Sequence, residues 1–436
     1  MEKPGDTSGR RGGRPRRGIG LAALSVLLLA VVACGDDDDD STAPEPEGAT
    51  DATDLLGAED EASGEPVRIG MVGDGVTDAF DNTAELLSAE AAAEYWNTHR
   101  GGVGGRPIEV VTCETGADPA GGTDCANQMV EEEVVAVALS QSAVADAVWE
   151  PLHAAGVPTL FFQTSTTDLL SDSETSFTMA NPLGTLFGTP IAVAESEGTD
   201  LIAFVNIDVP QALASFDSGA ADTVLGNAGL DYELVKIPPG TADMTSQMQQ
   251  VAESGAGVVQ IVGNDAFCIA AIQGLNAVGY DGQITSISQC ITDATREAVP
   301  GEQLEGISIA ALMALGASDD PAFQLYEAVM GTYGTEVSDV DNALAMGGYT
   351  TMASLATALE GISGDDVTPE TVAETIKAMD EADYPGADGL TFQCGGSAFP
   401  SQPAVCSNGS LRATLDAEGN PASYEPVDSS EIVEGM

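Results

Sequence analysis

Positively charged residues are scarce in this chain. Its 436 residues include 13 Lys and Arg against 70 Asp and Glu, a formal net charge of −57 at pH 7. Residues 1–33 hold six of these cations and two of the acids, which leaves seven cations against 68 acids in the remainder. The seven are scattered and form no basic stripe. This distribution argues against nucleic acid as a partner and against direct electrostatic attraction to anionic lipid.

Histidines and catalytic motifs are equally scarce. The chain has two histidines, His99 and His153, and contains neither G-x-S-x-G nor the Walker-type G-x-x-x-x-G-K. A hydrolase needs a nucleophile, a histidine and an acid gathered at strand ends, and neither histidine follows a predicted strand. Among the functions considered for this chain, an exported hydrolase is therefore the least favoured. No catalytic residue or cofactor is expected, and any ATP hydrolysis would belong to a partner.

The first 33 residues are typical of a lipoprotein signal peptide. Arginines between Arg10 and Arg17 precede an apolar run from Ile19 to Ala33, which is shorter than the ~20 residues that a membrane-spanning helix needs. We expect cleavage before Cys34 and lipid on its thiol. Residues 34–66 are acidic and have few large apolar side chains with which to form a core, so they are expected to be a disordered tether. The folded part would then lie at the extracellular face of the cell membrane.

The six cysteines that follow Cys34 favour disulfides over metal. No Cys-x-x-Cys spacing occurs, and only two histidines could complete a zinc site, so none is expected. An even number of cysteines in an exported chain favours disulfides, and of fifteen possible connectivities local pairing is the most economical. The local pairs are Cys113 with Cys125, Cys268 with Cys290, and Cys394 with Cys406.

From residue 67 onward, strand and helix patterns alternate. Short apolar runs such as residues 67–72 and 134–139 predict strands buried on both faces, and residues 86–96 predict a helix. Repeated β-α-β units imply right-handed connections and mostly parallel sheets. About 360 folded residues exceed one comfortable core, so we expect an α/β fold with two Rossmann-like lobes. A helical region over residues 321–379 should precede short antiparallel strands.

Polar residues follow two of the predicted strands. Ser140, Gln141 and Ser142 come after the run 134–139, and Gln163-Thr164-Ser165 comes after the next one. Ligands of parallel sheets bind beyond the carboxyl ends of the strands. Turn or N-cap roles explain either loop alone. Polar residues at the ends of two consecutive strands favour a ligand-binding site at this edge of the sheet.

Several segments resemble the branched-chain amino acid (Leu/Ile/Val)-binding family of ABC transporters, which has the type I periplasmic-binding fold. In order, they are VRIGMVGDG, EAAAEYWNTHRGGVGGRPIEVV, VVAVALSQSAVADAVWEPLHAAGVPTLFF, FCIAAIQGLNAVGYDG and YTTMASLATALEG. The resemblance implies two lobes joined by a three-crossing hinge, near Asn181, Leu315 and Tyr384. The implied divisions are residues 67–181 and 315–384 for lobe 1, 182–314 and 385–428 for lobe 2, and 429–436 for a tail.

The resemblance also implies a set of ligand contacts. In the family, the loops after the third and fourth strands of lobe 1 hold the carboxylate and ammonium of the solute, and these positions fall on Ser142, Gln163 and Ser165. Lobe 2 departs from the family, because Gln289 stands where a carboxylate is usual. Asp265 either replaces that carboxylate or is an ordinary surface or N-cap aspartate. The candidate ligand residues are Ser142, Gln163, Thr164, Ser165, Phe80, Asp208, Asp265 and Gln289.

Together these inferences predict a solute-binding lipoprotein of an ABC importer. It would be a monomer that captures an amino acid or related amide between closing lobes and delivers it to permease and ATPase subunits. A lipoprotein that senses the ligand and signals to a membrane receptor is the alternative, because both roles need the same lobes.

The lipid anchor is tested by Cys34→Ala. Because one thiol is the expected site of both lipidation and processing, the variant should appear in the medium or as an unprocessed precursor. Fractionation and the mass of the amino-terminal peptide measure this. A variant that stays in the membrane fraction and still requires detergent would contradict the prediction.

Overall fold

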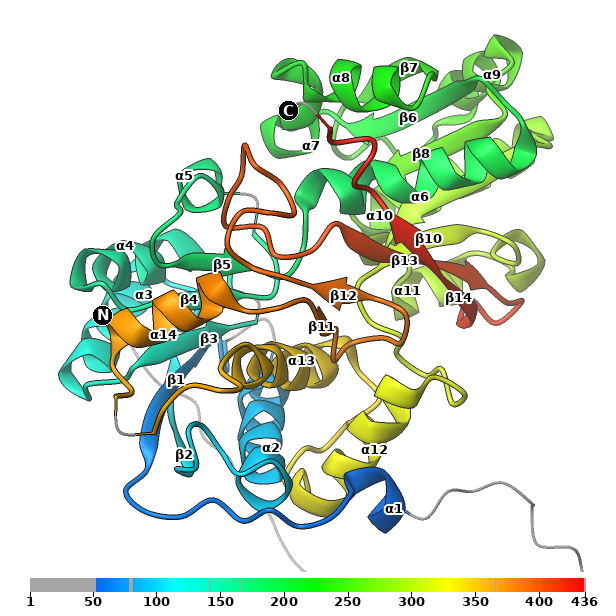
Figure 1. The fold of residues 1–436 in the computed structure, drawn as a ribbon. Helices are drawn as coiled ribbons and strands as arrows, with labels where there is room; N and C mark the ends of the chain where they lie inside the picture. The colour runs from blue at the N-terminus through cyan, green and yellow to red at the C-terminus, as the bar shows by residue number, and fades with distance from the viewer. Residues whose placement is uncertain (1–51, 78–80, 141, 165, 365, 435–436) are drawn as a thin grey trace, which may run out of the picture. The chain divides into compact units, whose positions relative to one another are not determined.

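Residues 67–178 build a parallel sheet of five strands, in the order β2-β1-β3-β4-β5 (Figure 1). The computed structural model describes residues 52–77, 81–140, 142–164, 166–364 and 366–434. The strands of this sheet are β1 (Val67–Gly73), β2 (Ile108–Glu114), β3 (Ala136–Leu139), β4 (Thr159–Phe161) and β5 (Ser176–Thr178). The helices in this part of the chain are α1 (Ala52–Leu56), α2 (Thr83–His99), α3 (Pro119–Glu131), α4 (Ala145–Ala155), α5 (Thr167–Leu170) and α6 (Pro182–Glu197).

Residues 201–428 contribute a second sheet of seven strands, in the order β14-β13-β10-β9-β8-β6-β7. Its strands are β6 (Leu201–Ile207), β7 (Asp231–Ile237), β8 (Val258–Val262), β9 (Gln283–Ile287), β10 (Ser308–Ala311), β13 (Gly409–Leu415) and β14 (Pro421–Asp428). The helices between them are α7 (Pro210–Asp217), α8 (Ala220–Asn227), α9 (Thr245–Ser254), α10 (Asp265–Val278) and α11 (Asp293–Ala298), with the 3-10 helices η1 (Ser288–Cys290) and η2 (Gly301–Gln303). Strands β6 to β10 are parallel to one another. Strand β13 runs antiparallel to both of its neighbours, β10 and β14.

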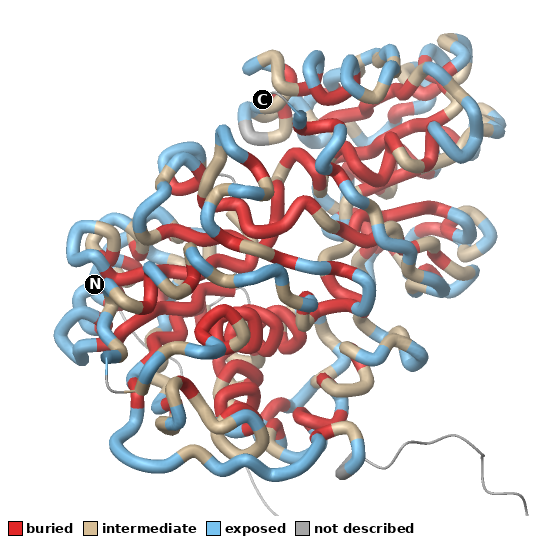
Figure 2. Tube along the Cα trace, viewed as in Figure 1, coloured by how far each residue is buried: buried red, intermediate tan, exposed pale blue. Residues whose placement is uncertain are grey.

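Helices cover both faces of each sheet, as the strand patterns require. Ala136 and Ala138 of β3 pack in one apolar cluster with α2, whereas Val137 and Leu139 pack in another with α3 and α4. Successive side chains of a strand point to opposite faces, so a strand that is apolar at every position must be covered from both sides. Figure 2 shows the inner strands buried and many of the connecting loops exposed, whereas the edge strands β2, β7 and β14 are mostly intermediate or exposed. The predicted α/β class with mostly parallel sheets is confirmed.

After β10 the chain returns to the first sheet. The helices of this return are α12 (Pro321–Tyr333), α13 (Ala343–Ala358) and α14 (Pro369–Ala378), and the two-stranded ladder that follows them is formed by β11 (Ala382–Asp383) and β12 (Thr391–Phe392). Both α12 and α13 contact α2. The chain then enters the second sheet again through β13 and β14. The predicted helical region is thus three separate helices, and the antiparallel end is confirmed.

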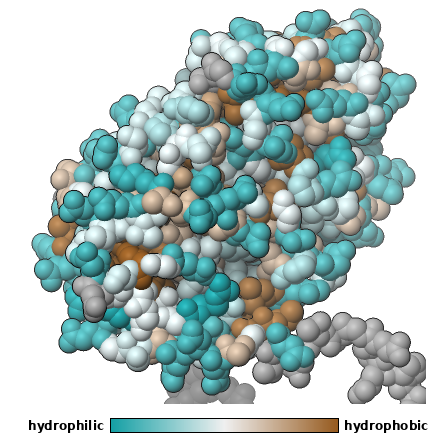
Figure 3. All heavy atoms as spheres, in the orientation of Figure 1, coloured by the Kyte–Doolittle hydropathy of each residue, from teal (hydrophilic) through white to brown (hydrophobic). Residues whose placement is uncertain are grey.

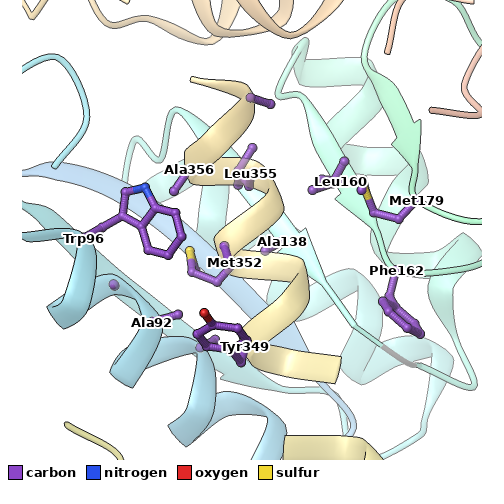
Figure 4. Packing of buried hydrophobic residues seen from close by; sticks show 14 of the residues in the cluster. Ala92, Trp96, Ala138, Leu160, Phe162, Met179, Tyr349, Met352, Leu355 and Ala356 are labelled. Carbon is purple, nitrogen blue, oxygen red and sulfur yellow. The ribbon is translucent and has the colours of Figure 1, made fainter. Parts of the chain in front are cut away.

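Contact between α2 and α13 forms the centre of the apolar core beside the first sheet. Tyr349 and Met352 of α13 pack with Ala92 and Trp96 of α2 beneath the sheet (Figure 4). The helices approach closely because Gly348 has no side chain. A Cβ at this position would lie 2.0 Å from the backbone oxygen of Glu85.

Three disulfides cross-link the described residues. They join Cys113 to Cys125, Cys268 to Cys290, and Cys394 to Cys406, which are the local pairs considered above. Each closes a segment of 12 or 22 residues, for which the loss of loop entropy in the unfolded chain gives about 2 to 4 kcal/mol of stabilisation. Among the helices that the structure describes, none is long and apolar enough to cross a membrane. Figure 3 shows hydrophilic residues over most of the visible face, with small hydrophobic patches between them.

Gly348→Ala should destabilise the fold by forcing α13 away from α2. Overpacking of a tight helix contact costs about 1 to 3 kcal/mol of unfolding free energy, measured by urea denaturation of the full chain. Gly331 in α12 is the matched control, because a Cβ there meets nothing within 4 Å. Gly331→Ala should instead stabilise by about 0.5 to 1 kcal/mol. Equal effects in the two variants would show that the contact of α2 with α13 is not close-packed.

Candidate functional site

A buried carboxylate joins the carboxyl ends of three neighbouring strands. Asp74 follows β1 and is only 4% exposed. Its Oδ1 accepts hydrogen bonds from the hydroxyls of Thr115 and Ser142, both at 2.7 Å, and its Oδ2 accepts one from the main-chain N–H of Ala143 at 2.8 Å. Thr115 follows β2, and Ser142 and Ala143 follow β3. One side chain therefore links the ends of β1, β2 and β3.

The strand register explains why these residues meet. Gly73 at the end of β1 pairs with Glu114 at the end of β2, and the preceding Val72 pairs with Leu139 at the end of β3. The main chain of the Asp74 turn is also held, since the Asp74 carbonyl accepts from Gly116 N–H at 3.0 Å. Polar residues just past each strand consequently arrive at one place on the edge.

The loop after β4 forms the next part of this edge. Thr166 donates its hydroxyl to Oδ1 of Asp146, in the first turn of α4, at 2.6 Å. Its main-chain N–H donates to the hydroxyl of Thr164 at 3.2 Å. A second carboxylate thus connects the first turn of α4 with the loop that follows β4.

These loops line a cavity of about 770 Å³. Its lining residues come from both sheets: Asp74, Asn82, Ser142, Ala143, Val144, Ala145, Asp146, Gln163, Thr164, Thr166, Ala180, Pro182, Thr185, Leu186, Ile287 and Gln289. Asp74 and Asp146 are acidic, and no lysine or arginine belongs to the lining that the described residues form. The cavity is therefore polar and acidic at the edge of the first sheet.

A second cavity of about 480 Å³ adjoins the first and is more apolar. The two share Gln163, Thr185, Ile287 and Gln289 in their walls. Its apolar lining includes Phe162, Ile309, Leu312, Met313 and Leu315. Tyr424 in the same wall donates its hydroxyl to the carbonyl of Leu315 at 2.6 Å, and burial raises the pKa of this phenol, so it stays neutral. The charged residues of this lining are Arg296 and Asp341. Together the cavities offer a polar compartment and an apolar one.

The structure brings four of the predicted ligand residues to one cavity. Ser142, Gln163, Thr164 and Gln289 all line it. Their contacts with a solute stay predictions. The hydroxyl proton of Ser142, expected to serve the solute, is instead donated to Asp74.

Two further candidates lie outside both cavity linings. Asp208 is exposed after β6. Asp265 begins α10 and accepts from the Thr292 hydroxyl at 3.1 Å, while the neighbouring Asn264 caps the helix. Phe80, Ser165 and Cys34 lie outside the described residues. Neither His99 nor His153 lines either cavity.

Sequence reasoning missed Asp74 and Asp146. Their signal was weak, because each is one of 70 acidic residues in the chain. The usable clue for Asp74 is its place immediately after the buried strand β1, where an acidic residue at a parallel strand end is a candidate for a site.

Thr115→Val should measure the strength of the Asp74 network. The valine keeps the shape of threonine but removes a hydrogen bond to a buried carboxylate, which costs about 1.5 to 3 kcal/mol of unfolding free energy. Thr83→Val is the control, because Thr83 also donates to an aspartate, Asp81, at an exposed site. The control should change the denaturation midpoint little. Similar midpoints for both variants would argue against a tightly bonded network.

Comparisons with known proteins identify the family and the fold of the chain. A model of the periplasmic binding protein family matches residues 66–404. Comparison with curated proteins finds no match.

Solved structures of similar fold cover nearly the whole folded part. The leucine-, isoleucine-, valine-, threonine- and alanine-binding protein from Brucella ovis is 13% identical with a TM-score of 0.66, over 85% of this chain and 97% of that one. The branched-chain amino acid transporter substrate-binding protein from Streptococcus pneumoniae, in complex with isoleucine, is 16% identical with a TM-score of 0.59, over 84% and 100%. A fatty acid ABC transporter substrate-binding protein from Thermomonospora curvata is 18% identical with a TM-score of 0.61, over 87% and 97%.

These identities establish the fold, and the family model spans more than half of the residues. The chain belongs to the periplasmic binding protein family and has the type I periplasmic binding fold of branched-chain amino acid ABC transporter proteins.

Proposed function

We propose that this protein is the extracellular solute-binding component of an ABC importer and that it delivers an amino acid or a related amide to a permease. The observation that carries the proposal is the composition of the larger cavity. Ser142 and Gln163 come from loops of the first sheet, and Gln289 comes from a loop of the second. A solute bound in this cavity would contact the loops of both sheets, so it would favour a conformation in which these loops lie close together.

The two-lobe division is part of the proposal. Lobe 1 takes residues 67–181 and 315–384, and lobe 2 takes residues 182–314 and 385–428. The path of the chain supports it, since α12 and α13 return to α2 after β10. A contact between two crossing segments supports the hinge, because the main-chain N–H of Ala314 donates to the carbonyl of Gly386 at 2.9 Å.

The apolar cavity supports a solute with an apolar part. Burial of a single aliphatic side chain there contributes about 1.5 to 3 kcal/mol, while the polar cavity hydrogen-bonds the head. The relatives named above bind isoleucine or are named for fatty acids. An amino acid amide with an aliphatic side chain has both parts.

Anchoring and partners complete the proposal. Lipid on Cys34 would hold the protein at the extracellular face of the membrane. The prediction of a disordered tether over residues 34–66 is wrong for residues 52–66, because Leu56 of α1 is buried in the core with α2 and the main-chain N–H of Asp60 donates to the carbonyl of Thr98 at 2.9 Å. Residues 34–51 remain as the proposed tether. This part rests on the sequence. Permease and ATPase subunits are the partners that the family implies.

A ligand-dependent melting screen of the full chain tests the function. Amino acids, their amides, polyamines and small sugars are the panel. A true ligand at a hundredfold excess over Kd stabilises the folded state by about 2.7 kcal/mol and raises Tm. Failure of the whole panel to raise Tm would contradict the proposal.

Variants on the two sides of the cavity locate the binding. Gln163→Ala and Gln289→Ala should each lower the affinity for the solute about tenfold, because each removes a side-chain hydrogen bond. Calorimetry measures this affinity. Gln249→Ala is the matched control, since Gln249 on α9 is exposed and bonds only to Glu253 among the contacts described. Wild-type affinity in both cavity variants would place the ligand elsewhere.

A further inference from the structure

Three hydrogen-bond donors at the edge of the first sheet are already engaged by the protein. Thr115, Ser142 and the main-chain N–H of Ala143 all donate to Asp74. These are three donors at the ends of β2 and β3, the two strands that flank β1, an arrangement that would otherwise suit an external carboxylate. Here the carboxylate is part of the chain.

On Asp74 and Ser142, the hydrogen-bonding positions that remain available are acceptors. A hydroxyl has one proton and two lone pairs. Ser142 gives its proton to Asp74 and uses one lone pair to accept the N–H of Val144 at 3.1 Å. Three donors occupy three of the roughly four lone-pair positions of the Asp74 carboxylate. One lone pair on each residue remains for a donor from a solute.

Asp74 is also held in place, so a competing anion cannot easily displace it. Its carbonyl accepts from Gly116 N–H, and Gly75 carbonyl accepts from Asn82 N–H, both at 3.0 Å. Gly75 has φ +65°, and a Cβ there would lie 2.3 Å from Oε2 of Glu114. The turn that carries Asp74 is therefore packed against the end of β2.

The negative charge of the cavity also disfavours a solute carboxylate. Asp146 lines the same cavity as Asp74, and neither lysine nor arginine belongs to its described lining. A solute carboxylate in this corner would face like charge without free donors from Thr115, Ser142 or Ala143, and such a juxtaposition is strongly unfavourable.

We infer that Asp74 is a specificity-determining residue, which fills the position of a solute carboxylate and selects a solute that presents an N–H donor and no carboxylate at this end. The solute class is an amine or a carboxamide with an apolar part. The inference rests on the proposed function and narrows it from amino acids to their amides and decarboxylated amines.

The first experiment compares matched probes on the full chain in detergent. The probes are leucine, leucinamide and 3-methylbutylamine, which share a side chain and differ at the carboxyl group. The wild type should bind leucinamide or the amine at least about tenfold more tightly than leucine. Leucine binding equal to or tighter than that of both other probes overturns the inference while leaving the importer function intact. Binding of none of the three also overturns it, and the broader screen then decides whether the importer function stands.

The second experiment removes the internal carboxylate. Asp74→Ala frees the three donors, so added acetate should raise the Tm of this variant more than chloride at the same concentration does. The affinity for leucine relative to that for leucinamide should rise at least tenfold. Acetate should not do so in the wild type. An unchanged preference with no acetate response overturns the inference.

Control variants separate this mechanism from simple loss of charge or fold. Asp146→Asn removes a charge from the same cavity without freeing the three donors, so acetate should not stabilise it. Asp118→Ala removes a carboxylate that accepts two main-chain N–H groups away from the cavity, and it should keep the wild-type preference. If Asp74→Ala does not fold, Asp74→Asn retains the shape and an accepting oxygen, and its preference for the amide over the acid should fall. An Asn variant with undiminished preference overturns the inference.

Discussion

The hydrogen bonds of Asp74 are the interaction on which the geometry of the site depends. A buried carboxylate needs several donors to compensate for lost hydration, and here they come from the ends of β2 and β3, which flank β1 in the sheet but are distant from it in the sequence. The requirement is mutual, because the donors at the start of α4 also need acceptors. The edge is consequently a bonded unit, and the cavity beside it has a fixed wall.

Covalent bonds brace the same loops. Cys113 lies in β2 two residues before Thr115, and its disulfide ties that strand to α3. Cys290 follows Gln289 in η1, and its disulfide ties this turn to α10. One disulfide therefore stands beside Gln289, which lines the cavity, and another stands near Thr115, which bonds to the lining residue Asp74. A site whose side chains are held in this way loses less conformational entropy when a solute binds.

The strands and the binding edge could be predicted because their signals are local. An apolar run such as residues 134–139 followed by Ser140 reports both a buried strand and its polar end within a few positions. The role of Asp74 could not, because its partners lie 41 to 69 residues away and meet only through strand order. Ser142 illustrates the difference: its place at the edge follows from the sequence, but the direction of its proton follows from Asp74.

The acidity of the whole chain and the acidity of the cavity act over different ranges. A net charge of −57 attracts cations generally, but at physiological ionic strength exposed charges are screened beyond about 8 Å. Asp74 is buried and lines the cavity, so its effect on a bound solute is screened much less. Solute selection is therefore set by a few fixed carboxylates and not by the surface. A change of salt should alter the rate at which a cationic solute arrives more than the preference for an amide over an acid, because steering acts at long range and the preference acts at contact.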